Sequence, residues 1–151
     1  MPNTPKDGFQ RFEEELDALG LPAHRHAELR VVAMPSDANP NGDIFGGWIM
    51  SHVDMAGGIA AMRQAHGRVA TVAVNSFVIK HSVRVGDLVG FYARVVRTGT
   101  TSITLNVVAY SQSWADLRRG VKVAEAELTY VAIDAEGNKR PVDAASAGGG
   151  V

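Results

Sequence analysis

The most continuous apolar pattern of the chain runs from residue 47 to residue 65 and predicts a helix. Large apolar side chains fall on every side of its helical wheel rather than on one face: Trp48, Ile49, Met50, Val53, Met55, Ile59 and Met62. A helix with this pattern is buried all round. Gly57 and Gly58 are unfavourable in an isolated helix, so we expect another backbone, that of a sheet, to approach closely there.

Five stretches rich in β-branched and aromatic residues predict strands. The first spans residues 28–34, and four longer ones follow the helix, at residues 69–80, 87–98, 101–111 and 121–134. Short turn signals at 85–87, 98–100 and 113–120 separate these four, which favours an antiparallel sheet. The order predicts an α+β hotdog fold, in which a curved antiparallel sheet wraps a long central helix.

The apolar pattern also predicts self-association. One sheet cannot cover a helix that is apolar on all sides, so a second copy should complete the burial. The two helices would then lie side by side, or the two sheets would join edge to edge.

The predicted domain covers residues 28–142, with an extension on each side. Residues 1–27 form an N-terminal extension whose stretch 8–20 predicts a short amphipathic helix, with apolar positions at Phe9, Phe12, Leu16 and Leu19. Residues 143–151 are small and glycine-rich, and we expect a disordered tail.

Composition excludes several classes of protein. The chain has 151 residues, a formal net charge of −1 and a pI near 6.5, which argues against a nucleic-acid surface. It has no cysteine, and its N-terminus lacks a signal-peptide pattern, so we expect a cytoplasmic protein. Ser51, His52 and Asp54 interrupt the long apolar helix, so we expect no membrane span. The pair His24-x-His26 lacks further ligands, so we expect no metal site.

The residues just before the helix combine turn signals with one carboxylate. Pro40–Gly42 favours a turn, Asp43 follows, and Gly46 and Gly47 leave backbone N–H groups bare at the helix start. Such a helix start can polarise an oxygen. A carboxylate beside it suits hydrolysis of an activated carbonyl, with Asp43 activating water and the amides holding the developing negative charge. An equally weighted alternative is that Asp43 only caps the helix.

Several motifs resemble the YciA-type acyl-CoA thioesterases, which are hotdog proteins. The resemblance covers roughly residues 28–142 and rests on Met34-Pro-x-Asp-x-Asn-x-Asn-Gly-Asp-Ile-Phe-Gly-Gly-Trp-Ile-Met50, Met55-Ala-Gly-Gly58, His66-Gly-Arg68, Val85-Gly-Asp87 and Gly99-Thr-Thr-Ser102. It implies hydrolysis of acyl-CoA to a free acid and CoA, without a cofactor, by a dimer that usually forms a trimer of dimers. It places the catalytic aspartate on Asp43, acting as general base or nucleophile.

The resemblance and the charge pattern together predict a CoA-binding surface. The Gly99–Ser102 hairpin offers amides and hydroxyls for phosphates, and basic residues lie near strand ends. The predicted substrate-binding residues are Asn41, Phe45, Arg68, Asn75, Lys80, His81, Arg97, Gly99, Thr100, Thr101 and Ser102. Two positions depart from the family pattern: Lys80-His81-Ser82 stands where relatives often have a basic residue and Pro, and Asn75 stands where they often have an acid.

Other chemistries are weaker or lack their residues. No glutamate lies between Glu28 and Glu125, and no nucleophile-elbow or phosphate-loop motif occurs. Asp54, inside the helix, is a second functional acid or, as we favour, a structural one bonded to a neighbouring strand. His52 and His66 are better explained by packing and by a helix end. A hotdog protein that binds acyl-CoA without cleaving it is the alternative function.

Overall fold

The computed structural model describes residues 26–143, so the predicted helix over residues 8–20, His24 and nearly all of the predicted tail lie outside it. Within these residues the chain forms five strands, a short 3₁₀ helix (η1) and one long helix. The bounds are β1 Leu29–Val32, η1 Pro35–Asp37, α2 Gly46–Ala65, β2 Val69–Ile79, β3 Leu88–Thr98, β4 Ser102–Ser113 and β5 Asp116–Ala132.

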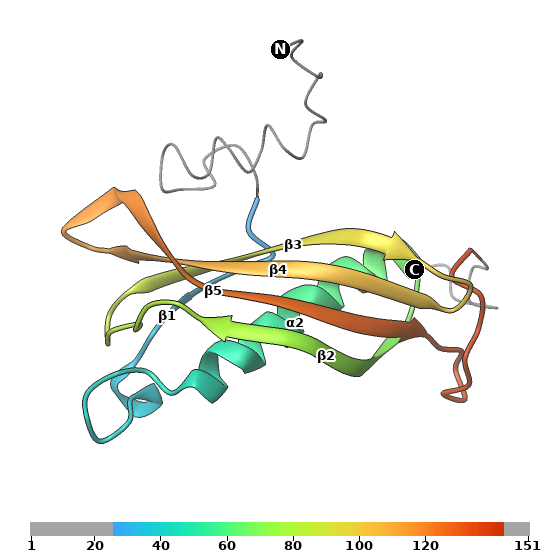
Figure 1. The fold of residues 1–151 in the computed structure, drawn as a ribbon, viewed down its shortest axis with the longest axis horizontal. Helices are drawn as coiled ribbons and strands as arrows, with labels where there is room; N and C mark the ends of the chain where they lie inside the picture. Colours follow the sequence, from blue (N-terminus) through green and yellow to red (C-terminus); the bar gives the residue numbers. More distant parts are fainter. Residues whose placement is uncertain (1–25, 144–151) are drawn as a thin grey trace, which may run out of the picture.

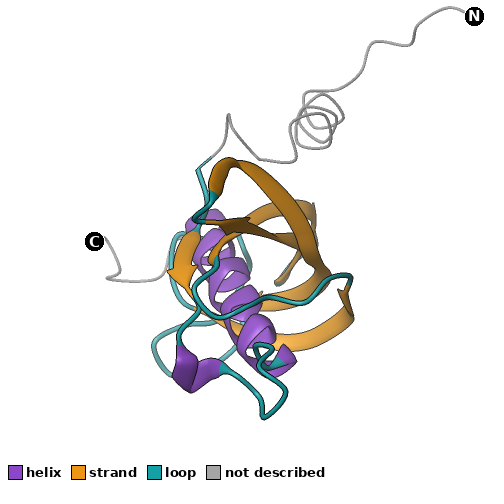
Figure 2. Ribbon diagram, turned by 90° about the vertical axis from the view of Figure 1, so that its left-hand side faces the viewer, coloured by secondary structure: helices purple, strands orange, loops and turns teal. Residues whose placement is uncertain are grey.

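The strands form one antiparallel sheet with the order β1-β3-β4-β5-β2. This sheet curves around α2 (Figure 2), which confirms the predicted α+β hotdog fold. Strand β4 lies at the centre and turns fully buried apolar residues toward the helix, among them Ile103, Leu105 and Val107. No helix within residues 26–143 is both long and apolar enough to cross a membrane.

Two predicted connections were wrong. The turn at 85–87 does not join neighbouring strands, because β2 pairs with β5 at the far edge of the sheet, for example Ile79 with Ala124. The predicted turn over 113–120 is much shorter, since Ser113 already pairs with Asp116. Residues 117–119 are exposed. The first part of β5 therefore lies outside the core and lacks the apolar alternation by which a strand is recognised in sequence.

Helix α2 packs on the sheet through its small residues. A Cβ on Gly57 would overlap the hydroxyl of Tyr130 on β5 and lie 3.1 Å from two of its ring carbons. The predicted neighbour, a sheet, is confirmed, but the close approach is made by an aromatic side chain and not by backbone.

One face of α2 and the edge strand β2 stay uncovered in the single chain. Met55 and Met62 on α2 are 46% and 44% exposed, and Val74 and Val78 on β2 are 49% and 50% exposed. The prediction that one sheet cannot bury this helix completely is therefore confirmed. Strand β2 ends one edge of the sheet and has 11 residues, so it offers a long, apolar pairing edge.

Candidate active site

The loop before α2 is organised by one side chain that we did not predict, Asn39. Its side-chain oxygen accepts hydrogen bonds from the backbone N–H groups of Asn41 (2.9 Å) and Asp43 (3.1 Å). Its own backbone N–H donates to the Asp43 carbonyl (2.6 Å) and its carbonyl accepts from Gly42 (3.0 Å). The spacing Asn39-x-Asn41 is typical of an Asx turn and was the available signal. Gly42 has φ +89°, which favours glycine at this position.

Asp43 does not cap the helix. The N-cap of α2 is Phe45, and it makes no side-chain capping bond. The backbone of the Asp43 segment is tied to residues 83–84, since Asp43 pairs with Arg84 and the Ile44 N–H donates to the Val83 carbonyl at 2.9 Å. The Asp43 carboxylate accepts no hydrogen bond within residues 26–143. The alternative of a helix cap was therefore wrong.

The first two N–H groups of α2 are available for a ligand. Those of Gly46 and Gly47 donate to no acceptor in the described part of the chain, as the first turn of a helix without a capping side chain requires. A Cβ on Gly46 would lie 2.9 Å from Ile79 Cδ1, whereas nothing lies within 4 Å of one on Gly47. Glycine thus lets the end of β2 pack against Gly46, while the space beside Gly47 is open.

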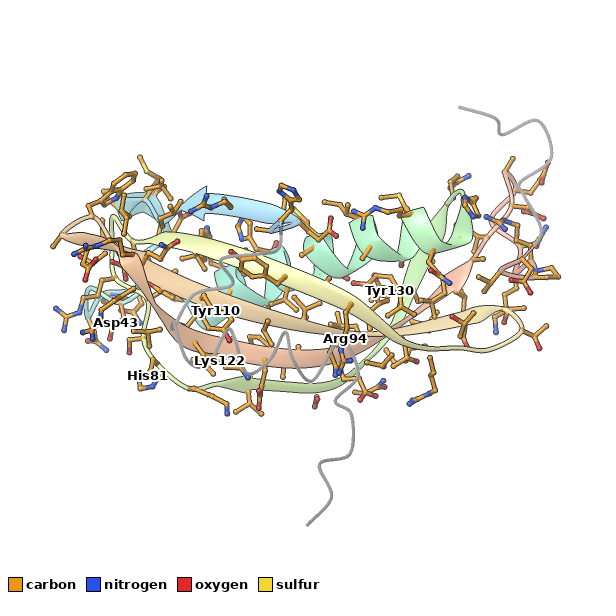
Figure 3. All side chains as sticks on the ribbon, turned by 90° about the horizontal axis from the view of Figure 1, so that it is seen from above. Asp43, His81, Arg94, Tyr110, Lys122 and Tyr130 are labelled. Carbon is orange, nitrogen blue, oxygen red and sulfur yellow. The ribbon has the colours of Figure 1, made fainter. Side chains whose placement is uncertain are left out.

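Lys80 and His81 follow β2 and lie at the same end of the molecule as Asp43. Figure 3 shows Asp43, His81 and Lys122 together at this end. The Lys80 ammonium lies 3.2 Å from Glu125, and that of Lys122 lies 2.9 Å from the other oxygen of the same carboxylate. The hydrogen bond from Lys122 and the weaker one from Lys80 lower the pKa of Glu125 below its ordinary value. Phe45, 52% exposed, and Asn41 belong to the same end.

The remaining predicted contacts lie at the opposite end of α2 or on the sheet. The β3–β4 hairpin, with Gly99, Thr100, Thr101 and Ser102, is at the right of Figure 1, whereas the loop before α2 is at the left. Arg68 follows α2 and donates to the Ala135 carbonyl (3.0 Å). Because α2 has 20 residues, its two ends are about 30 Å apart. One chain therefore does not bring the predicted residues into one site.

On β2 and β3, two predicted residues are engaged with β5. Asn75 donates to Glu127 (3.1 Å) and Thr129 (2.9 Å), and Arg97 lies 3.7 Å from the carboxylate of Glu127. These contacts hold Asn75 and Arg97 beside the same glutamate.

Asp54 is bonded to two strands, which confirms the predicted hydrogen bond to a neighbouring strand. Its Oδ1 accepts from the Thr71 hydroxyl on β2 (2.7 Å) and from the Tyr130 hydroxyl on β5 (3.0 Å). Tyr130 also donates to the Asp54 carbonyl at 2.8 Å. Burial and the charge of Asp54 raise the pKa of Tyr130. Thr71 and Tyr130 are contacts that we did not foresee, because they depend on where two strands pass the helix.

The helix histidines have the packing and helix-end roles that we expected. The His52 ring stacks on Phe91 (centroids 5.5 Å apart), its Nδ1 lies 2.8 Å from the Trp48 carbonyl, and His66 ends the helix with φ +53°. Residues 26–143 hold no group of three or more His, Cys, Asp and Glu side chains suited to a metal ion.

The curved sheet around one helix, with bare amides at the helix start, defines a protein of the hotdog class. The model of the thioesterase superfamily matches residues 41–116. The acyl-CoA thioester hydrolase YciA of Salmonella typhimurium is 47% identical over 116 residues, which are 76% of this chain and 87% of that relative.

Two solved structures agree with this match. The hexameric thioesterase y2039 from Yersinia pestis has a TM-score of 0.75 and 42% identity, over 80% of this chain and 98% of that one. A hexameric hotdog fold thioesterase of Campylobacter jejuni has a TM-score of 0.73 and 40% identity, over 78% of this chain and 90% of that one. The chain belongs to the thioesterase superfamily and, within it, to the family of YciA-type acyl-CoA thioesterases.

Proposed function

We propose that this chain hydrolyses acyl-CoA thioesters to a free carboxylic acid and CoA. The observation that carries the proposal is the start of α2, where the N–H groups of Gly46 and Gly47 have no acceptor within residues 26–143 and space beside Gly47 is open. Two such donors can hold the oxyanion that forms when a thioester carbonyl is attacked. The sequence similarity to YciA, an acyl-CoA thioester hydrolase, supports acyl-CoA as the substrate class.

The reaction needs a carboxylate, and two are available, Asp43 and Asp54. Asp43 is three residues from the bare amides in the chain, and its carboxylate accepts no hydrogen bond in the described residues, so both of its oxygens are available to water or substrate. Asp54 is eight residues beyond Gly46, about 12 Å along the helix axis, and one of its oxygens is held by Thr71 and Tyr130. We therefore place Asp43 first for this role and keep Asp54 as the second candidate.

Either carboxylate can act by one of two routes. As a general base it takes a proton from water while the water oxygen attacks the carbonyl carbon; the C–S bond then breaks and the proton passes to the CoA thiolate. As a nucleophile it forms a mixed anhydride and releases CoA thiolate, and water then hydrolyses the anhydride.

A second copy of the chain would bring the separated parts of the site together. If two β2 edges pair antiparallel about a two-fold axis, the start of one α2 lies near the end of the other. The Gly46 end of one protomer then meets Arg68 and the β3–β4 hairpin of its partner. The exposed Val74 and Val78 of β2 support this edge pairing. We propose a dimer as the minimum unit and a trimer of dimers as the assembly, as the relatives from Yersinia and Campylobacter are hexameric.

The CoA moiety would then lie across the two protomers. Its phosphates would contact the partner's Gly99–Ser102 hairpin, with Arg68 and Arg97 nearby, or Lys80 and His81 at the Asp43 end. Asn41, Phe45 and Asn75 complete the proposed substrate-binding set. Lys80 and Arg97 each form an ion pair with a glutamate. On binding a phosphate, each would leave its glutamate or contact the glutamate and the phosphate together.

Release of free thiol from a panel of acyl-CoA esters of increasing chain length tests the proposed function. We expect turnover that requires the intact protein and saturates with substrate. Tight CoA binding without turnover across the whole panel would instead establish a non-catalytic acyl-CoA-binding protein. Sedimentation at micromolar concentration tests the assembly, because a stable monomer would leave the two halves of the site about 30 Å apart.

A further inference from the structure

The face of the sheet that points away from α2 holds a buried tyrosine, Tyr110 on β4. It pairs with Gly90, next to the core pair of Phe91 and Ala109. Because successive residues of a strand point to opposite faces, Tyr110 lies on the outer face of the sheet. It is nevertheless only 4% exposed, whereas a tyrosine on a solvated face keeps part of its ring in water. The burial indicates that this face is an interface.

Tyr92 on β3 extends the buried area. Its ring packs edge-on against Tyr110, with the centroids 6.0 Å apart, and burial raises the pKa of Tyr92. Gly90 makes room for the ring, since a Cβ there would lie 3.0 Å from a ring carbon of Tyr92. Val108 on β4 pairs with Tyr92 and shares its face. Tyr92, Val108 and Tyr110 thus form an apolar area, here called the outer patch.

The charge beside the outer patch is positive. Strands β1, β3 and β4 contain no aspartate or glutamate and three arginines, Arg30, Arg94 and Arg97. Arg30 pairs with Gly90, and Arg94 stands two residues after Tyr92, so both belong to the outer face. An occupant that fits this area needs an apolar side bordered by acids.

The glutamates of the outer face lie on β5 and have cations beside them. Glu125 lies within 3.2 Å of the Lys80 ammonium and 2.9 Å of that of Lys122. Glu127 lies 3.7 Å from Arg97. Their charges are balanced within the sheet, so they do not repel an acidic occupant on β3 and β4.

Residues 8–20 of the same chain have the required pattern. The helix that their sequence predicts has its large apolar residues on one side: Phe9, Phe12, Leu16 and Leu19. At about 3.6 residues per turn, Glu13 and Glu15 fall on the two borders of this side, and Glu14 and Ala18 fall opposite. The segment therefore matches the outer patch in both apolar surface and charge.

The described chain also begins close to the outer patch. The Glu28 N–H donates to the Phe91 carbonyl (2.8 Å), one residue before Tyr92. Residues 21–26 can extend for about 20 Å, and neighbouring strands lie about 5 Å apart. A helix over residues 8–20 is about 20 Å long, so it can reach β3 and β4 and lie along them.

We propose that residues 8–20 form a helix that docks on the outer patch. Its apolar side covers Tyr92 and Tyr110, and its border glutamates face Arg30 and Arg94. The docked segment gives the sheet a second layer on the face that α2 does not cover. The inference is independent of the proposed function, because it involves neither the Asp43 loop nor the amides at the start of α2.

Leu16→Asp in the full-length protein tests the docking, because it places a charge on the apolar side of the segment. Ala18→Asp is the matched control, with the same charge on the opposite side. Trypsin cleaves after Arg11 only when the segment opens. We expect this cleavage to become about ten- to hundredfold faster in Leu16→Asp and to change less than about twofold in Ala18→Asp.

Nitration by tetranitromethane locates the docking site. The chain has three tyrosines, and Tyr130 is 1% exposed in the core. Mass spectrometry should show Tyr92 and Tyr110 nitrated about tenfold faster in Leu16→Asp than in the wild type or in Ala18→Asp. Tyr130 should stay unreactive in all three proteins, which verifies that the domain is folded.

The border acids are tested by the same nitration. The double variant Glu13→Gln/Glu15→Gln should raise the nitration rate of Tyr110 about two- to tenfold, and Glu14→Gln should change it less. Equal rates in these two proteins would overturn the contacts to Arg30 and Arg94.

Two results would overturn the docking itself. One is cleavage after Arg11 that is equally fast in the wild type, Leu16→Asp and Ala18→Asp. The other is faster cleavage in Leu16→Asp with Tyr110 still protected, which would show that a different occupant, such as a second copy of the chain, covers the outer patch.

Discussion

The two carboxylates near α2, Asp43 and Asp54, are held in opposite ways. Asp43 belongs to a loop whose backbone is fixed by Asn39 and by residues 83–84, while its carboxylate has no hydrogen-bond partner in the described chain. Asp54 belongs to a regular helix, and its carboxylate is fixed by Thr71 and Tyr130. The carboxylate without a hydrogen bond, beside the bare amides of Gly46 and Gly47, suits a reacting group, whereas the carboxylate tied to two strands suits a structural one.

The largest expected effect comes from Asp43→Asn. Asparagine preserves the loop, since the contacts there are made by the Asp43 backbone, but it cannot take a proton or attack a carbonyl. We expect kcat to fall about 10²–10⁴-fold in a steady-state thioesterase assay, with CoA binding and the melting temperature nearly unchanged. Retention of more than about a third of the wild-type kcat would exclude Asp43 as base or nucleophile.

The same substitution at Asp54 sharpens the comparison. Asp54→Asn keeps an oxygen that can still accept from Thr71 and Tyr130. We expect a smaller loss of kcat, about tenfold or less, which is about 1.4 kcal/mol in activation free energy. The assay is the one used for Asp43→Asn, with circular dichroism to verify folding. A larger loss at Asp54 than at Asp43 would reverse the assignment of the two carboxylates.

The next prediction concerns a cation that we propose to bind the CoA phosphates, in contrast to the two carboxylates. Arg97→Ala should raise KM severalfold and change kcat little, because contacts to the CoA phosphates are equal in the ground and transition states. Arg118→Ala is a control, since that side chain is 95% exposed and, within residues 26–143, its ion pair is with Asp116. A fall in kcat alone would show that Arg97 had been misassigned. For Lys80→Ala we likewise expect KM to rise more than kcat falls.

The smallest expected effect is a change of stability with pH. It arises from the buried Tyr130 hydroxyl and its hydrogen bond to Asp54. The pKa of Tyr130 is raised in the folded state. Its contribution is therefore fully present below about pH 10, the unfolded value, and is lost as the pH rises through the folded value. Urea unfolding between pH 8 and 11 should show stability falling above about pH 10. Tyr130→Phe should lack this part of the fall, and an identical profile would contradict the coupling.

Much of the architecture followed from local patterns. Residues 47–65 are apolar on all sides and form α2 within one residue of the predicted start, since burial pattern and helix period are both local properties. The loop motif around Asp43, with bare glycine amides, was also recognisable, because turn chemistry depends on neighbouring residues. The family was recognisable for the same reason, as its motifs are continuous in the chain.

Contacts between distant segments could not be predicted in this way. Strand β2 lies beside β5 and not β3, and Tyr130 meets Asp54 across 76 positions of sequence. The separation of Arg68 and Gly99–Ser102 from Asp43 likewise depends on which end of α2 each strand reaches. The chain pattern determined the helix, the strands and the reactive loop, because these depend on a few consecutive residues. Which carboxylate is held, and by which donors, was decided only by the tertiary structure, because packing brings β2, β5 and α2 together at a point that no local period encodes.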